Sequence, residues 1–127
     1  MAKETIFTTH APSPIGPYSQ AIKANSILFV SGQIALNPET NELVTHNIEQ
    51  ETRQVMLNIG EILKTAGMNY HNIVKTSIFL KDMNNFAKVN EIYGHFFTGQ
   101  YPARETVEVA RLPKDANVEI SVIAVKD

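Results

Sequence analysis

The chain ends in Val118-Glu-Ile-Ser-Val-Ile-Ala-Val125, eight residues whose strand-like composition predicts a β-strand with side chains on alternate faces. One face is wholly apolar and carries Val118, Ile120, Val122 and Ala124. The other face mixes polar and apolar side chains, namely Glu119, Ser121, Ile123 and Val125. Both faces of this strand therefore need cover from other apolar groups.

The rest of the chain predicts further strands and two helices. From Asn47, apolar residues recur at helical spacing, which predicts an amphipathic helix with Asn47 as its N-cap and Gly67 as its stop. Asp82 is expected to cap a second helix that ends near Gly99. The predicted strands are residues 5–9, 27–31 continuing towards 35, 73–80, 105–110 and 118–125.

This order of elements favours a single α+β domain over residues 1–127, with both helices packed on one face of the sheet. Two helices cannot cover both faces. We call the sheet face without helices the free face, and we expect Glu119 to lie on it. An apolar surface of this kind is typically buried against a second copy, so we expect a homo-oligomer.

The composition excludes several kinds of chemistry and disfavours two kinds of partner. The 127 residues contain no cysteine, which excludes disulfides, thiol nucleophiles and thiolate-bound metal sites. Lys and Arg number 11 against 13 Asp and Glu, a net charge of -2 that does not suit a nucleic-acid or anionic-membrane binder. The apolar runs fall far short of the ~20 residues of a membrane helix, and we expect a cytoplasmic protein.

The sequence also lacks the patterns of cofactor sites. The histidines do not have the spacing of metal ligands, and they are His10, His46, His71 and His95. A phosphate-binding glycine-rich loop, a dinucleotide fingerprint and a serine nucleophile elbow are all missing from the sequence. We therefore expect neither a metal nor an organic cofactor.

Strand alternation predicts where a polar site lies. Arg104 and Thr106 point to one side of their strand, and Val107 and Val109 point to the other. If the valines pack on the helices, Arg104 lies on the free face together with Glu119. The two charged groups then form either a small polar pocket at the subunit interface or a purely structural ion pair.

Two segments next to predicted loops are weaker candidates for the functional site. Ser31-Gly32 ends an apolar strand, where the glycine provides either close access for a ligand or simply a bulge. Tyr18 follows the proline-rich stretch 11–17, which is predicted to be a stiff, extended loop. Its phenol is either part of a site or a packing aromatic.

Several sequence motifs, taken together, closely resemble those of the RidA/YjgF family. They are Ile15-Gly-Pro-Tyr-Ser-Gln20, Val30-Ser-Gly-Gln-Ile34, Ile73-Val-Lys-Thr76 with Lys81-Asp82, Phe86 with Val89-Asn90, Pro102-Ala-Arg104, Val107-Glu-Val-Ala-Arg-Leu-Pro-Lys-Asp115 and Val118-Glu-Ile120. The resemblance is collinear from about residue 11 to residue 125. It implies a chorismate-mutase-like α+β fold and a homotrimer with sites in the clefts between subunits.

The resemblance also implies an activity. The archetypal branch of the family hydrolyses reactive 2-imino acids and their enamine tautomers to 2-oxo acids and ammonia, without a cofactor. These substrates arise when pyridoxal-phosphate enzymes act on serine and threonine. The chain is thus expected to be a 2-iminobutanoate/2-iminopropanoate deaminase that clears reactive intermediates.

Site residues follow from the resemblance position by position. Arg104 resembles the residue that holds the substrate carboxylate, and Glu119 resembles the acidic residue that positions or activates the attacking water. Tyr18 matches a position of the catalytic pocket. The substrate-binding positions are matched by Ser31, Gly32, Thr106 and Asn90, of which Gly32 and Thr106 correspond to backbone contacts.

One departure concerns the arginine motif. Many close relatives read Pro-Ala-Arg-Ser-Cys-Val, whereas this chain reads Pro102-Ala-Arg-Glu-Thr-Val107. Thr106 keeps any role that uses its backbone N–H, and alternation directs Glu105 away from Arg104. Two alternatives stay open: a cleft that binds 2-oxo acids or small anions without turnover, and a ribonuclease, which the acidic balance disfavours.

Overall fold

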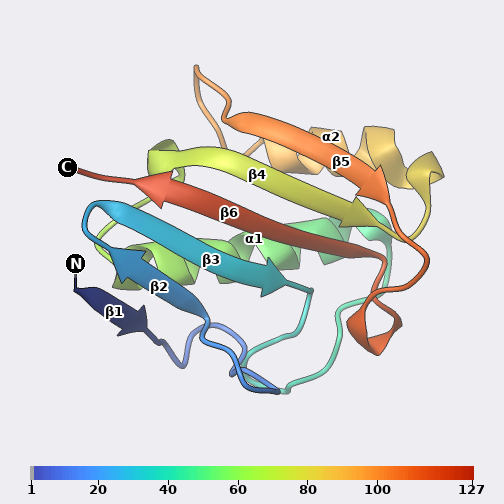
Figure 1. The fold of residues 1–127 in the computed structure, drawn as a ribbon. Coiled ribbons are helices and arrows are strands. Elements are labelled where there is room, and N and C mark those ends of the chain that lie inside the picture. The colour runs from blue at the N-terminus through green and yellow to red at the C-terminus, as the bar shows by residue number, and fades with distance from the viewer. Residues whose placement is uncertain (1) are drawn as a thin grey trace.

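A six-stranded mixed sheet backed by two helices makes up the fold (Figure 1). The structure is a computed structural model and describes residues 2–127. The main elements are β1 (Lys3–Ile6), β2 (Ala21–Ala24), β3 (Ile27–Gln33), α1 (Ile48–Thr65), β4 (Ile73–Leu80), α2 (Phe86–Gly94), β5 (Ala103–Glu108) and β6 (Val118–Val125). Short 3-10 turns are η1 (Tyr70–Asn72), η2 (Met83–Asn85) and η3 (Pro113–Asp115). The sheet order is β1-β2-β3-β6-β4-β5, with β4 and β5 parallel and the other pairs antiparallel.

The last strand, β6, lies inside the sheet between β3 and β4. Its bounds are those that the sequence predicts. Ile120 and Ala124 are fully buried, and they share the core with Leu28 of β3 and Ile78 of β4. The alternation of β6 therefore defines which face of the sheet meets the helices.

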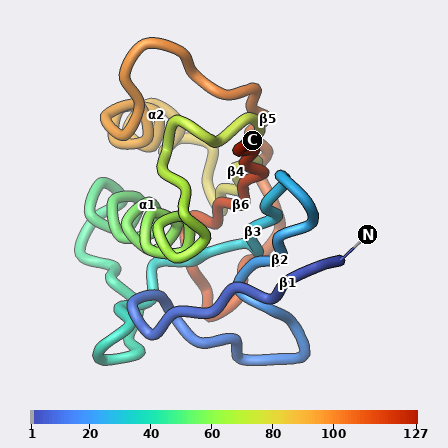
Figure 2. The backbone as a smooth tube through the Cα atoms, turned by 90° about the vertical axis from the view of Figure 1, so that its left-hand side faces the viewer, coloured from blue at the N-terminus to red at the C-terminus, as the bar shows by residue number. Residues whose placement is uncertain are grey.

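Both helices lie on the same side of the sheet, as expected (Figure 2). Asn47 caps α1, because its Oδ1 accepts a hydrogen bond from the Gln50 N–H at 2.8 Å. At the other end Gly67 has φ 76°, and the Met68 N–H donates to the Leu63 carbonyl at 2.8 Å. A left-handed glycine of this kind is a common helix stop. Neither helix, and no other helix within residues 2–127, is long and apolar enough to cross a membrane.

The second helix is shorter than predicted. Asp82 does act as a cap, but it caps η2, where its Oδ1 accepts from the Asn84 N–H at 2.9 Å. The prediction that this helix ends near Gly99 is wrong, because α2 ends at Gly94. Beyond it the Phe97 N–H donates to the Gly94 carbonyl in a tighter turn, which closes the helix.

The N-terminal strands also differ from the prediction. β1 spans Lys3–Ile6 and not 5–9, because the Thr8 N–H leaves the sheet to donate to Gln20 Oε1 at 2.8 Å. The four-residue β2 was not predicted, since it is too short to show a strand period. It forms a hairpin with β3 around Asn25, whose φ of 56° suits a tight turn. β5 begins at Ala103, two residues before the predicted start.

The free face exposes apolar side chains. Phe29 is 46% exposed, and its neighbour across the β3–β6 pair is Ile123. Ile27 at the start of β3 and Val107 of β5 are also exposed. The helices thus cover one face only, and the homo-oligomer that would cover the other stays a prediction.

Candidate functional site

A carboxylate lies against glycine backbone on the free face of the sheet. Glu119 comes from β6, and Gly32 lies on the neighbouring strand β3 where a bulge interrupts the register between Val30 and Gln33. A Cβ at position 32 would stand only 2.6 Å from Glu119 Oε2. Glycine thus lets the carboxylate lie against the backbone, whereas a side chain at position 32 would displace it.

Glu119 lines a cavity of about 440 Å³ that brings four of the predicted site residues together. These four are Tyr18, Ser31, Gly32 and Glu119. The rest of the lining is mainly apolar and comprises Pro12, Ser13, Ile15, Gln33, Ile34, Leu36 and Pro113. Burial in these surroundings raises the pKa of the Glu119 carboxyl above its ordinary range.

Backbone contacts hold the polar wall of this cavity. The Ser31 hydroxyl donates to the Ser19 carbonyl, and the Ser31 N–H donates to the Gln20 carbonyl at 2.9 Å. Tyr18 is half exposed, and its hydroxyl accepts a hydrogen bond from the Ile15 N–H at 3.3 Å. The phenol O–H remains free to donate into the cavity.

Gln20 holds the proline-rich loop from within, a role that sequence reasoning missed. Its side chain is buried, and its Nε2 donates to the carbonyls of Thr8 and Pro12 at 3.0 and 2.8 Å. Pro12 in turn lines the Glu119 cavity. A buried glutamine next to a proline-rich segment was the available signal, but burial cannot be read from one residue in a sequence.

Arg104 lies in a different place, among side chains of α2. Its Nη1 donates to Asn90 Oδ1 at 2.5 Å, so the structure brings these two candidate site residues together. The guanidinium carbon also lies 5.6 Å from the ring centroid of Phe86 and 5.4 Å from that of Tyr93. Aromatic faces and an amide attract a guanidinium without neutralising it.

The surroundings of Arg104 leave its charge available. Within residues 2–127, Arg104 has no carboxylate at ion-pair distance. Burial raises the pKa of Tyr93, although its hydrogen bond to Thr76 and the charge of Arg104 oppose this. The guanidinium lines a second cavity of about 340 Å³ with Asn90, Tyr93, Gly94, Tyr101 and Pro102.

The prediction that Arg104 and Glu119 share the free face is wrong. Arg104 is paired in register with Thr76, which is buried beneath the helices, so its side chain lies on the helix side. Val107 instead lies on the free face, in register with Phe79 and 42% exposed. β5 is an edge strand, so its valines are not required to face the core.

The residues next to Arg104 occupy opposite faces, as alternation requires. Glu105 points away from Arg104, accepting from the Ser77 hydroxyl at 2.8 Å and pairing with Lys75 at 3.4 Å. Thr106 follows on the same side as Arg104 but lines neither cavity. Its Oγ1 is buried and has no hydrogen-bond partner among the described residues 2–127.

Metal chemistry finds no support in the arrangement of side chains. Within residues 2–127, no group of three or more His, Asp or Glu side chains is placed to hold a metal ion. The ionisable groups in the lining of the two cavities are the Glu119 carboxylate, the Arg104 guanidinium and the phenols of Tyr18, Tyr93 and Tyr101.

Replacing Thr106 with valine tests whether its hydroxyl is unpartnered. Thr106→Val keeps the β-branched shape and removes a buried polar atom, so the free energy of unfolding is expected to rise by about 1 kcal/mol. Urea denaturation measures this change, with Thr106→Ser, which keeps the hydroxyl, as the matched control. A fall in stability for Thr106→Val would show that the hydroxyl has a partner in the assembled protein.

Comparison with known proteins agrees with this fold. A family model described as endoribonuclease L-PSP matches residues 8–126. A mouse protein named 2-iminobutanoate/2-iminopropanoate deaminase is 47% identical, over 98% of this chain and 92% of that protein. The structure of a Rid-family protein, YyfA from Yersinia pestis, is 55% identical with a TM-score of 0.96, covering 98% of this chain and 100% of that one. Escherichia coli TdcF, solved with bound serine, is 40% identical with a TM-score of 0.94 and covers 98% and 99% of the two chains. The chain therefore belongs to the RidA/YjgF family.

Proposed function

We propose that this protein is a hydrolytic deaminase that converts 2-imino acids and their enamine tautomers to 2-oxo acids and ammonia. The main support is that Arg104 has no acidic partner within residues 2–127 and that, separately, the half-buried Glu119 carboxylate lies in a mainly apolar cavity. The Arg104 guanidinium is suited to bind a substrate carboxylate, and the Glu119 carboxylate is suited to hold a water molecule. The mouse relative named as a deaminase supports the same reaction.

We further propose that two copies of the chain complete each site in a homotrimer. Arg104 and Asn90 come from one subunit, and Tyr18, Ser31 and Glu119 come from its neighbour. Because the two half-sites lie on opposite sides of the sheet, one chain alone cannot bring them to one substrate. The exposed apolar side chains of the free face supply a surface for such an assembly. The number of subunits follows from the family resemblance.

Arg104 is suited to hold the carboxylate of a 2-imino acid. A guanidinium is planar, permanently charged and able to donate two parallel hydrogen bonds to a carboxylate. Asn90 holds one nitrogen and so orients the group. Thr106, on the same strand as Arg104, would offer its backbone N–H to the substrate. Gly32, which has no side chain to cover its backbone, would offer that backbone from the other side of the cleft.

Hydrolysis then needs only an oriented water molecule and a base. The protonated imine is already electrophilic, so water attacks its carbon while the ionised Glu119 accepts a proton from that water. The nitrogen of the resulting carbinolamine takes that proton back from Glu119. The C–N bond then breaks and ammonia leaves, while the hydroxyl group gives its proton to the Glu119 carboxylate as the C=O bond of the 2-oxo acid forms. Tyr18 can donate a hydrogen bond to the reacting groups from the cavity wall. A single general base of this kind contributes about 10²–10⁴-fold.

A coupled assay tests the reaction directly. Purified protein added to threonine dehydratase and threonine should speed the release of 2-oxobutanoate. Arg104→Ala should lower kcat/KM by about 30-fold or more, since losing one partner of a charged contact costs at least ~2 kcal/mol. Arg53→Ala, on the exposed side of α1, is the matched control and should leave the rate unchanged. Arg104-dependent binding of 2-oxobutanoate with no rate increase would instead mean a binding protein without turnover.

The pH dependence of the reaction tests the role of Glu119. The base must be ionised, so the rate should fall as pH falls through the raised pKa of Glu119. The acid limb of kcat/KM is expected above about 4.3, the ordinary pKa of a glutamate. Glu119→Gln should abolish this limb and lower the rate by about 10²-fold or more. An acid limb unchanged by that substitution would assign the base to another group.

A further inference from the structure

The turn that precedes β6 has a strained backbone. Lys114 and Asp115 both have φ of 55°, in the left-handed region that residues with a Cβ seldom occupy. Two such residues in succession are rarer still, and neither is a glycine. A backbone of this kind persists where the surrounding structure holds it in place.

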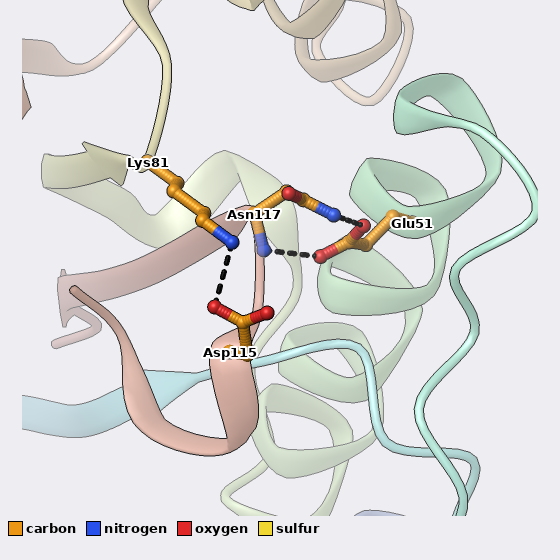
Figure 3. A network of polar contacts seen from close by, with 4 residues as sticks. All are labelled: Glu51, Lys81, Asp115 and Asn117. Carbon is orange, nitrogen blue, oxygen red and sulfur yellow. Dashed lines mark hydrogen bonds and ion pairs between the residues drawn. The ribbon is translucent and has the colours of Figure 1, made fainter.

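Lys81, at the end of β4, holds this turn at two points. Its Nζ lies 2.6 Å from Asp115 Oδ1 (Figure 3). Its backbone N–H donates to the Asn117 carbonyl at 3.0 Å. The first contact fixes a strained residue, and the second fixes the chain just after it. Both come from one residue that is 34 positions away from Asp115 in the sequence.

Glu51 of α1 holds the same segment from the helix side. Only 1% of this residue is exposed, and both of its carboxylate oxygens are used. Oε2 accepts from the Asn117 N–H and Oε1 accepts from Asn117 Nδ2, each at 2.8 Å (Figure 3). We call Glu51, Lys81, Asp115 and Asn117 the polar clamp. Through it, Asn117 is bound by its N–H, its carbonyl and its side chain.

The clamped turn forms part of the Glu119 cavity. Pro113, the first residue of η3, lines that cavity. On either side of the turn, Leu112 and Ala116 pack in a small apolar cluster with Ile34 and Leu36, which also line the cavity. A shift of the turn would therefore move one wall of the cavity together with the side chains behind it.

We propose that Lys81 and Asp115 are positioning residues that, with Glu51 and Asn117, hold the strained turn and so limit the size of the 2-imino acid side chain. Neither residue lines the cavity, so their effect passes through Pro113. The clamp also fixes the chain two residues before Glu119. This inference rests on the proposed deaminase function and adds to it the element that sets substrate size.

Kinetics on two substrates of different size test the proposal. The substrates are 2-iminopropanoate and the larger, branched 2-imino acid formed when an amino-acid oxidase acts on leucine. Lys81→Met keeps the length of the side chain and the backbone N–H but removes the ammonium group. We expect the KM for 2-iminopropanoate to rise by about 3- to 5-fold with kcat nearly unchanged, and the preference for the small substrate to fall by a similar factor, because an exposed ion pair contributes at most about 1 kcal/mol.

Three further variants separate positioning from general loss of structure. Asp115→Ala removes the other end of the ion pair and should give the same changes as Lys81→Met. The double variant should be no worse than either single variant, because both remove one interaction. Lys81→Arg keeps the charge and should restore the small-substrate preference. Lys64→Met, an exposed lysine in the last turn of α1, is the matched control and should behave as the wild type.

Calorimetry with 2-oxobutanoate and with the branched 2-oxo acid provides a readout that needs no turnover. The clamp variants should lose the preference for the smaller acid in binding as well as in catalysis. Wild-type KM values and size preference in both Lys81→Met and Asp115→Ala would overturn the proposal. If Lys81→Met does not fold, Asp115→Ala, whose side chain is exposed, decides the question alone. A wild-type protein that binds these acids but releases no ammonia would contradict the deaminase function and not the clamp.

Discussion

A sheet has two faces, and in this chain two helices cover only one of them. β6 lies inside the sheet with apolar side chains on both of its faces, so its second face needs cover that residues 2–127 do not provide. Phe29 and Val107 are exposed on that free face. The proposed assembly, and with it the proposed site, follows from this one constraint.

The separation of the charged groups has a clear chemical benefit. If Arg104 and Glu119 met within one chain, the ion pair would occupy the guanidinium and lower the pKa of the carboxyl. On opposite faces, Arg104 is held by Asn90 and by aromatic rings, and burial raises the pKa of Glu119. Under the proposed function, the guanidinium therefore stays available for a substrate carboxylate, and the raised pKa makes the ionised Glu119 a stronger base toward water.

Local patterns in the sequence predicted much of the fold. The alternation of β6 and the helix signals Asn47 and Gly67 were confirmed, because short-range sterics and hydrogen bonds control them. The side of the sheet on which Arg104 lies was predicted wrongly, because valine side chains of an edge strand do not have to point to the core. The family motifs assign both Tyr18 and Glu119 to the site, and the structure places both in one cavity.

Local sequence patterns did not predict the polar contacts between residues that are far apart in the chain. Glu51 bonds to Asn117 across 66 positions of the chain, and no spacing rule links two such residues. The strain in the turn was also invisible, because lysine and aspartate at positions 114 and 115 are ordinary turn residues in composition. Both features depend on packing between elements that only the folded structure brings together.

The central claim, that two copies of the chain share each site, is tested most directly by mixing subunits. Arg104→Ala and Glu119→Gln proteins, each nearly inactive alone, are denatured together in equal amounts and refolded. If one copy supplies the arginine and another the carboxylate, random assembly restores both groups in about a quarter of the clefts, and deaminase activity returns to about that fraction of the wild type. A mixture no more active than its components would place both residues in a site within one chain and contradict the account.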